Sequence, residues 1–291
     1  MRFKVLIENT IISNNIDECA RENISEYICE HGLSIYIEFE DKRILLDAGQ
    51  SGSFIDNAYR MGVDLKGLDF CVLSHGHYDH SGGFDRFLSS YQDTKIYAMR
   101  EVNNNYYSGS GGEIHYIGLS KEMYNKHKDR FVLLDAYNKL CDNVYILPHS
   151  TQDLNKIGER CKLYKDCGGE YIPDDFSHEL SLIFDTPKGL VIFNSCSHGG
   201  IKNIFSEISD RFGNKRIYAF VGGLHMKGSK NDTEICIYSD EEIAEFCNYL
   251  LEKNISKLYT CHCTGNVAYE KIKHILKDKV EYISTGANID I

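Results

Sequence analysis

The residues VLSHGHYDHSGGF, from 72 to 84, constrain this chain more than any other stretch. Within six residues they place His75, His77, Asp79 and His80, side chains that commonly bind metal ions. An apolar run precedes them and two glycines follow, which predicts a strand leading into a turn. His75 and His77 can point the same way, while Asp79 and His80 lie beyond the bend. Because one loop cannot easily close a tetrahedral site alone, we predict that the four divide between two ions.

Short runs rich in Val, Ile, Tyr and Phe recur along the chain and predict strands. These runs lie at residues 2–8, 34–40, 42–49, 69–75, 94–99, 143–148, 180–186, 189–195, 216–223, 256–262 and 280–284. Helical patterns lie at residues 53–61, 200–212, 239–253 and about 265–277. A β-rich first half followed by alternating strands and helices predicts a layered α/β domain with a mixed sheet.

Residues 100–178 have a different character. They contain the turn-rich stretch NNNYYSGSGG (103–112) and a segment with little periodicity (149–178). Both lie between two predicted halves of the sheet, where a long loop often serves an active site. We therefore predict a single domain over residues 1–291, with an insertion at 100–178 that covers the active site.

Charge and hydropathy narrow the range of partners. The formal net charge is −11, which disfavours nonspecific nucleic-acid binding because such binding depends on clustered Lys and Arg. The sequence has no apolar run long enough for a membrane span, and its start, MRFKVLIENT, is typical of a strand rather than a signal peptide. We expect a cytoplasmic enzyme for a small molecule, with no nucleic-acid or membrane partner, and a homo-oligomer stays open.

The chain has 11 cysteines but no CxxC pair. An odd count without an export signal favours reduced thiols over a disulfide framework. An iron–sulfur cluster on Cys141, Cys161 and Cys167 is the alternative, although their spacing matches no standard pattern. Cys196 and Cys263 flank other candidate site residues, and either a nucleophilic role or a packing role would suit them.

Three further histidines follow predicted strands. His198 ends the stretch NSCSH, His225 ends VGGLH, and His262 lies in TCHCTG. A single histidine at a strand end is more often structural than a ligand. Three of them, in a chain that already carries the 75–80 cluster, favour a shared metal site.

These motifs resemble the metallo-β-lactamase superfamily, whose HxHxDH signature stands here at residues 75–80. LLDAG (45–49) resembles an early strand-end motif in which the aspartate, here Asp47, braces the metal loop. The resemblance implies an α/β fold, the αββα sandwich, in which two mixed β-sheets are flanked by helices. It also implies two sets of ligands, which are His75, His77 and His198 for the first ion, and Asp79, His80 and His262 for the second.

SCSHGGI, GGLHM, CHCTG and DDFSHELSLIF resemble one branch of the superfamily more closely. That branch comprises 7,8-dihydropterin-6-methyl-4-(β-D-ribofuranosyl)aminobenzene-5′-phosphate synthases. The resemblance implies a metal-dependent hydrolase or transferase for a small anionic metabolite, phosphorylated or pterin-like. Two divalent ions would activate a nucleophile or stabilise a leaving group. Zinc suits an imidazole-rich site, and iron or manganese is the alternative.

His225 is where the sequence departs from the superfamily pattern, because many dinuclear members carry a bridging aspartate in this region. Either His225 replaces that carboxylate as a ligand, or it acts on the substrate. We favour the second role. The predicted catalytic residues are therefore Asp79, which also binds an ion, and His225.

Substrate contacts are predicted around the turn after His262. Thr264 and Gly265 lead into a helix whose N-terminus could bind an anion, although an ordinary capped helix is equally consistent. Lys227 could add positive charge or be merely solvated. His178, beside Glu179, could line the pocket or form a surface pair with it.

The sequence is also compatible with two other functions. The first is an iron-binding redox or sensing protein on the same fold, and the second is a nuclease. The acidic balance and the lack of a basic stripe disfavour the nuclease.

Overall fold

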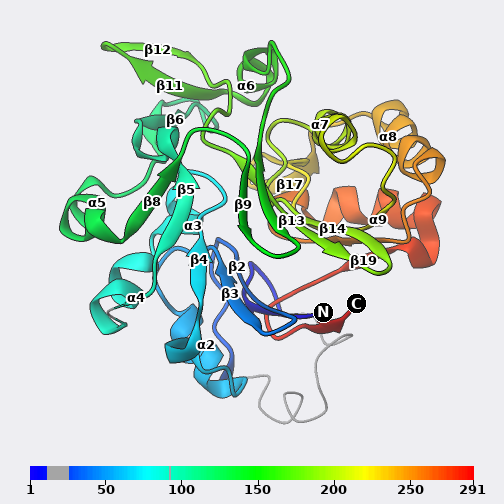
Figure 1. Ribbon diagram of the computed structural model, residues 1–291. Coiled ribbons are helices and arrows are strands. Elements are labelled where there is room, and N and C mark those ends of the chain that lie inside the picture. The colour runs from blue at the N-terminus through cyan, green and yellow to red at the C-terminus, as the bar shows by residue number, and fades with distance from the viewer. Residues whose placement is uncertain (12–25, 92) are drawn as a thin grey trace.

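The computed structural model describes residues 1–11, 26–91 and 93–291. They form two seven-stranded sheets that face each other, with helices on both outer faces (Figure 1). This is the αββα arrangement that the family resemblance implied. None of the helices formed by the described residues is long and apolar enough to cross a lipid bilayer.

The first sheet contains the strands of the N-terminal half and one late strand. β1, β2 and β3 pair antiparallel, while β3, β4, β5 and β8 pair parallel, so the sheet is mixed. In spatial order the strands are β20 (Asn288–Asp290), β1 (Arg2–Ile7), β2 (Ser34–Phe39), β3 (Lys42–Leu46), β4 (Phe70–Val72), β5 (Ile96–Met99) and β8 (Phe131–Leu134).

The second sheet is also mixed. β14, β15, β18 and β19 pair parallel, while β9, β10, β13 and β14 pair antiparallel. In spatial order its strands are β19 (Val280–Tyr282), β18 (Lys257–Thr260), β15 (Ile217–Gly222), β14 (Gly189–Phe193), β13 (Leu180–Thr186), β10 (Val144–Pro148) and β9 (Asn138–Cys141).

A continuous apolar layer fills the space between the sheets, because alternate strand residues point inward. Phe3 of the first sheet meets Phe193 of the second edge-to-face, with ring centroids 5.4 Å apart. Two further clusters lie under the outer helices. The helices are α2 (Phe54–Arg60), α4 (Phe84–Ser90) and α5 (Lys121–His127) on one side, and α7 (Ile201–Phe212), α8 (Asp240–Glu252) and α9 (Asn266–Leu276) on the other.

The predicted insertion at 100–178 has different boundaries in the structure. Residues 131–148 provide β8, β9 and β10, which belong to the two main sheets. The part before them contributes α5 to the outer helices, and the remaining residues include a separate four-stranded sheet together with α6 (Asn155–Cys161). Its strands, in spatial order, are β12 (Glu170–Pro173), β11 (Leu163–Cys167), β6 (Tyr106–Ser108) and β7 (His115–Tyr116).

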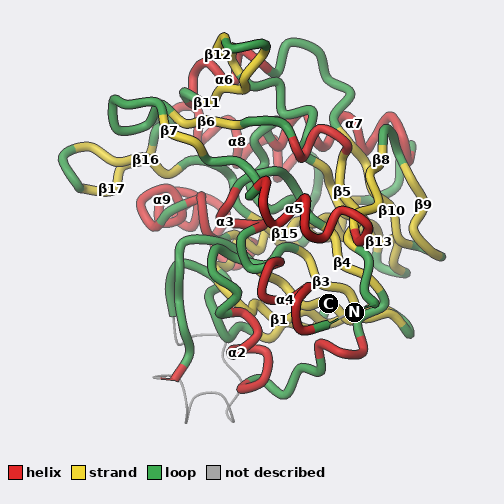
Figure 2. Tube along the Cα trace, turned by 90° about the vertical axis from the view of Figure 1, so that its left-hand side faces the viewer, coloured by secondary structure: helices red, strands yellow, loops and turns green. Residues whose placement is uncertain are grey.

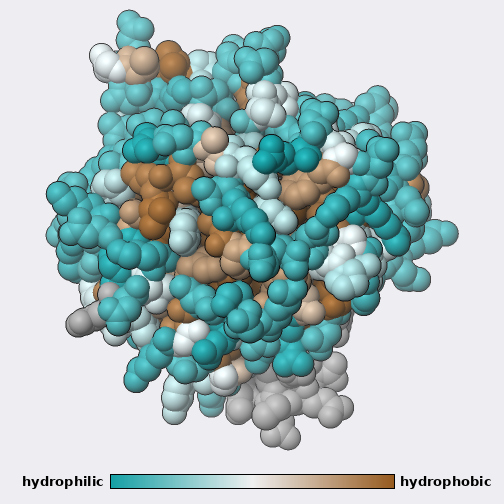
Figure 3. Space-filling view, viewed as in Figure 1, coloured by the Kyte–Doolittle hydropathy of each residue, from teal (hydrophilic) through white to brown (hydrophobic). Residues whose placement is uncertain are grey.

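Two smaller features complete the fold. The short helix α3 (Tyr78–Ser81) contains half of the HxHxDH signature. β16 (Lys227–Lys230) and β17 (Thr233–Cys236) form a ribbon that projects from the body of the molecule (Figure 2). The face seen in Figure 3 is mainly hydrophilic, with apolar residues gathered in recesses between the hydrophilic ones.

Candidate metal centre

The predicted site residues meet at one edge of the sandwich. β4 of the first sheet ends just before His75. β14, β15 and β18 are parallel neighbours in the second sheet, and they end before His198, His225 and His262. Because the carboxyl ends of parallel strands share one edge, these three loops lie together.

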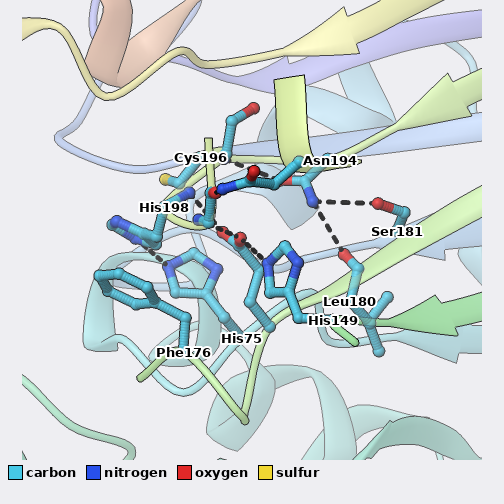
Figure 4. Close-up of polar contacts among 12 residues, drawn as sticks. His75, His149, Phe176, Leu180, Ser181, Asn194, Cys196 and His198 are labelled. Atoms are coloured by element: carbon cyan, nitrogen blue, oxygen red, sulfur yellow. Dashed lines mark hydrogen bonds and ion pairs between the residues drawn. The ribbon is translucent and has the colours of Figure 1, made fainter. Parts of the chain in front are cut away.

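The first predicted ligand group, His75, His77 and His198, is brought together by the fold. The ring centroids of His75 and His77 are 4.6 Å apart, and each is 4.9 Å from that of His198. The Nε2 atoms of His75 and His198 are 3.4 Å apart. Phe176 stacks on the His198 ring, at 5.2 Å and 12° (Figure 4), which fixes its plane.

The second predicted group, Asp79, His80 and His262, is equally compact. Asp79 Oδ2 lies 3.2 Å from His262 Nε2 and 3.6 Å from His80 Nε2. The two Nε2 atoms are 3.2 Å apart. Atoms bound about 2.0–2.1 Å from a tetrahedral ion lie roughly 3.4 Å from one another. The spacing of this group therefore fits one bound ion, and the ligand assignment itself stays a prediction.

The protonation of the two groups also suits metal ions. Burial lowers the pKa of His75, His77 and His198 well below its usual value, so the rings are neutral and able to bind a metal. Within the described part of the chain, His77 Nε2 and His198 Nδ1 are buried without a hydrogen-bond partner. A buried polar atom without a partner is costly, and a bound ion would relieve this cost around the first group.

The second group attracts cations. Burial opposes the ionisation of Asp79, but the charge of His80 and the hydrogen bond with His262 hold its pKa well below its usual range. Burial also lowers the pKa of His80, yet Asp79 and Asp47 outweigh it and raise this pKa to about 9. A divalent ion would take over the positive charge that the His80 proton carries here.

Comparison with known proteins agrees with this geometry. The Metallo-beta-lactamase superfamily model matches residues 28–149, which include the HxHxDH signature. Tm1679, whose solved structure is titled a metal-dependent hydrolase of the beta-lactamase superfamily, aligns with a TM-score of 0.78 at 26% identity. That alignment covers 100% of this chain and 99% of Tm1679. The chain belongs to the metallo-beta-lactamase superfamily.

Two curated relatives of this metallo-beta-lactamase superfamily member come from Methanocaldococcus jannaschii. One is a 7,8-dihydropterin-6-methyl-4-(beta-D-ribofuranosyl)-aminobenzene-5'-phosphate synthase, 28% identical over 96% of both chains. Another is the uncharacterized protein MJ0448, 26% identical over 94% of both. The metal-dependent relative and the buried His and Asp groups together support an enzyme that uses metal ions.

Asp47 holds the metal loop in place, as predicted for the LLDAG motif. It accepts hydrogen bonds from the Ser74 amide and hydroxyl, each at 2.7 Å, and its Oδ2 lies 2.7 Å from His80 Nδ1. The Ser74 hydroxyl lies 2.8 Å from His75 Nδ1. One carboxylate thus orients a histidine of each group, directly for His80 and through Ser74 for His75.

We expect Asp47→Asn to weaken metal binding about 10- to 100-fold, the usual effect of losing a carboxylate behind a ligating histidine. Competition with a chelator would measure the change. Asp142→Asn removes a carboxylate that is 88% exposed and serves as the control. Equal affinity in Asp47→Asn and the wild type would contradict the bracing role.

The turn after the signature packs without space for side chains. A Cβ atom on Gly82 would lie 2.0 Å from the Gln50 carbonyl oxygen, and one on Gly83 would lie 2.0 Å from that of Ala48. Only glycine permits this approach. The metal loop is therefore held directly against the turn that carries Asp47.

The N-terminal segment supports His262, a role that sequence reasoning missed. Glu8 accepts a hydrogen bond from the His262 amide at 2.7 Å and another from the Tyr282 hydroxyl at 2.8 Å. Asn9 Oδ1 lies 2.9 Å from His262 Nδ1. The Nε2 atom of His262 is thus left to face Asp79 and His80.

His178 does not lie where a substrate contact was predicted. Its side chain is fully buried, and Nδ1 accepts a hydrogen bond from the Gly76 amide at 2.9 Å. Its Nε2 lies 3.0 Å from Asp174 Oδ2. The residue supports the backbone between His75 and His77, which is a positioning role.

Glu179 is likewise buried and does not pair with its neighbour at the surface. It accepts hydrogen bonds from the amides of His198 and Gly199 at 2.9 and 3.1 Å. His149 lies between Glu179 and Glu207, at 2.7 and 3.0 Å. Burial lowers the pKa of His149, but the hydrogen bonds with both carboxylates raise it to about 10. A buried charged triad therefore positions the His198 loop.

Thr264 and Gly265 lie at the N-terminus of α9, for which the sequence left an anion site and an ordinary capped helix open. Thr264 is buried, and its hydroxyl accepts a hydrogen bond from the Leu224 amide at 2.9 Å. The N-terminus of α9 is already served by Glu234, which accepts a hydrogen bond from the Val267 amide at 3.0 Å. An intramolecular carboxylate therefore holds the place predicted for a substrate anion.

A cavity of about 260 Å³ opens in front of the two groups. Several predicted residues reach it, and its wall adds residues that sequence reasoning missed. The predicted residues are His77, Asp79, His198, His225, Lys227 and His262, and the added ones include His31, Tyr78, Ser108, Ser110 and His115. His31, which is 53% exposed, lies 3.3 Å from Asp79 and so borders the second group.

His225 lies beside the first group. Its ring centroid is 4.4 Å from that of His198, and its amide donates a hydrogen bond to Cys263 Sγ at 3.3 Å. Burial lowers the pKa of His225 to about 4, so the ring is neutral near pH 7. Among the described residues, the sets of side chains spaced to share an ion do not include His225.

The alternative iron–sulfur cluster gains no support. The potential metal-binding sets found over residues 1–11, 26–91 and 93–291 include none of Cys141, Cys161 and Cys167. Cys141 packs against the layer between the sheets, and Cys161 packs in the small cluster under the four-stranded sheet.

Proposed function

We propose that this protein is a dinuclear metal-dependent hydrolase or group transferase that acts on a small anionic metabolite, phosphorylated or pterin-like. The observation that carries the proposal is the placement of two compact ligand groups, with Nε2 atoms 3.2–3.4 Å apart within each, at the base of one cavity. In this proposal, His75, His77 and His198 bind one ion, while Asp79, His80 and His262 bind the other.

The donor set suits zinc better than iron or manganese, because five of its six members are imidazoles. Bound divalent ions supply Lewis acidity, which activates a nucleophile or stabilises a leaving group. The choice between water and another nucleophile separates hydrolysis from transfer. The synthase relative supports transfer, and Tm1679, a metal-dependent hydrolase, supports hydrolysis.

The volume of the cavity supports a substrate of modest size. About 260 Å³ accommodates one ring system or a phosphorylated sugar. Lys227 Nζ at the rim lies 3.6 Å from Glu234 Oε2, so its charge is partly offset. The 5'-phosphate in the name of the synthase relative is a further reason to propose a phosphorylated substrate.

The proposed function can be tested by metal reconstitution and activity. The purified protein, loaded with zinc, should turn over a phosphoester, or a dihydropterin that carries a leaving group on its methyl carbon together with an arylamine acceptor. A chelator should abolish this turnover, and added zinc should restore it. A protein that binds no divalent metal under these conditions would refute the proposal.

His225 is proposed to stabilise a developing oxyanion, because its ring is neutral and borders the cavity. His225→Ala should keep both metal ions and lose activity by about 10²-fold or more. Metal analysis and kinetics on one preparation would measure both. His274→Ala replaces an exposed histidine and is the control. Metal loss in step with activity would instead make His225 a ligand, and no change in either would make it a packing residue.

The four-stranded sheet is proposed to determine substrate choice. Ser108, His115 and Leu163 come from β6, β7 and β11 and line the cavity. Amide hydrogen exchange in residues 106–117 and 163–167 should slow when a substrate analogue binds, with α7 as the internal reference. Protection confined to the two main sheets would show that the four-stranded sheet has no part in binding.

A further inference from the structure

Cys196 occupies an unusual position between the two ligand groups. It follows β14, two residues before His198, and it is only 2% exposed. Its sulfur lies within 4.8 Å of ring nitrogens of His75 and His198, and equally of His80 and His262. In the described parts of the chain, one potential metal-binding set is His75, Cys196 and His198, and another is His80, Cys196 and His262. Cys196 is the member that these two sets share.

Packing does not explain this thiol. Cys196 belongs to none of the four hydrophobic clusters formed by the described residues, whereas Cys71, Cys247 and Cys261 each belong to one. Its sulfur lies 3.3 Å from His80 Nε2. Figure 4 shows the sulfur next to the His198 ring, on the loop that follows Asn194.

Independent evidence for a missing ligand comes from two histidines of the first ligand group. His198 Nδ1 and His77 Nε2 are buried and have no protein partner among the described residues. These two side chains are 3% and 5% exposed. No described protein group pairs with these two nitrogens, which supports a bound group that the protein alone does not provide.

The charge of the site indicates what the sulfur can do. Two divalent ions carry four positive charges, and the six predicted ligands carry one negative charge, on Asp79. Neither of the two potential metal-binding sets that contain Cys196 includes a carboxylate. A thiolate between the two groups would supply a second negative charge and so reduce the net positive charge of the buried site.

We propose that the Cys196 thiolate is a metal ligand that lies between the two ions and takes the place of the bridging carboxylate. The thiol loses its proton to solvent as the ions bind, and sulfur–metal bonds form. The 3.3 Å from Sγ to His80 Nε2 suits two atoms bound to one ion at about 2.3 and 2.0 Å. This inference rests on the proposed dinuclear function and adds a seventh ligand to it.

Cobalt substitution tests the proposal without an activity assay. Wild-type protein loaded with two Co²⁺ ions should show a near-ultraviolet sulfur-to-cobalt charge-transfer band beside the visible ligand-field bands. Cys196→Ser should lose the charge-transfer band completely while it still binds cobalt. Cys263→Ser, at the neighbouring thiol, and Cys247→Ser, in the cluster under α8, should both keep it.

The outcomes separate this proposal from the proposed function. Two bound cobalt ions without the charge-transfer band, or a band that persists in Cys196→Ser, would overturn the thiolate ligand alone. A wild-type protein that binds no cobalt and no zinc would overturn both proposals. Circular dichroism checks whether Cys196→Ser folds. If it does not, Cys263→Ser still identifies the bound thiol. A charge-transfer band that persists in Cys263→Ser supports Cys196, and a band that disappears there would overturn the proposal.

Discussion

Replacing Asp79 with alanine should lower the metal content of the purified protein from two ions per chain to one. Asp79 Oδ2 lies within 3.6 Å of both His80 Nε2 and His262 Nε2, so its loss removes the anion from the second group. Activity should fall by 10²-fold or more, because a dinuclear mechanism needs both ions. Elemental analysis and kinetics on the same preparation would measure the two effects.

The first group should keep its ion in this variant. Asp210→Ala, which removes an exposed carboxylate from α7, should retain two ions and full activity. Full metal content in Asp79→Ala would exclude Asp79 from the ligands. Loss of both ions would show that the two groups do not bind independently.

His149→Ala should reduce the free energy of unfolding by about 3–5 kcal/mol, because it leaves Glu179 and Glu207 buried without their cation. Urea unfolding would measure this loss. Lys139→Ala breaks a surface pair with Asp142 and should change stability by about 1 kcal/mol or less. A similarly small change in His149→Ala would contradict a stabilising role for the triad.

The difference in unfolding free energy between the wild type and His149→Ala should depend on pH in a defined direction. The folded protein raises the pKa of His149 from 6.5 to about 10, so its contribution is complete below pH 6.5 and is lost as pH rises toward 10. The pKa values of Glu179 and Glu207 are lowered from 4.5, chiefly by His149 against the effect of burial, so their contribution is lost as pH falls below about 4.5. The stability gap between wild type and His149→Ala should therefore be wider at pH 6 than at pH 9.

Local sequence signals predicted most of the fold. The helical pattern predicted at residues 239–253 corresponds to α8, where Ser239 and Glu242 form a capping box. The HxHxDH signature placed four candidate ligands on one loop, and the strand-end histidines were expected beside them. These predictions succeeded because helix caps, strand patterns and strand-end loops depend on residues that are close in sequence.

The missed features depend on contacts between distant residues. Glu8 binds the His262 amide across 254 positions, and His31, which precedes β2 in the sequence, reaches Asp79, which follows β4. Thr264 looked like a helix cap, but Gly265 is the N-cap and Glu234 comes from another strand to meet the helix. Residues 131–148 were assigned to an insertion because turn-rich segments flank them, and their pairing with β5 and β13 has no local signal.

The close packing of Gly82 and Gly83 has a consequence for how this scaffold can evolve. Any larger residue there would displace the backbone that carries the candidate ligands, so this part of the molecule tolerates little variation. The wall formed by β6, β7 and β11 contacts the same cavity from a separate sheet, with exposed turns at Gly111 and Gly112 that have open space around them. New substrate preferences can therefore arise by substitutions in that wall, while the loop that carries the candidate ligands has little room to change.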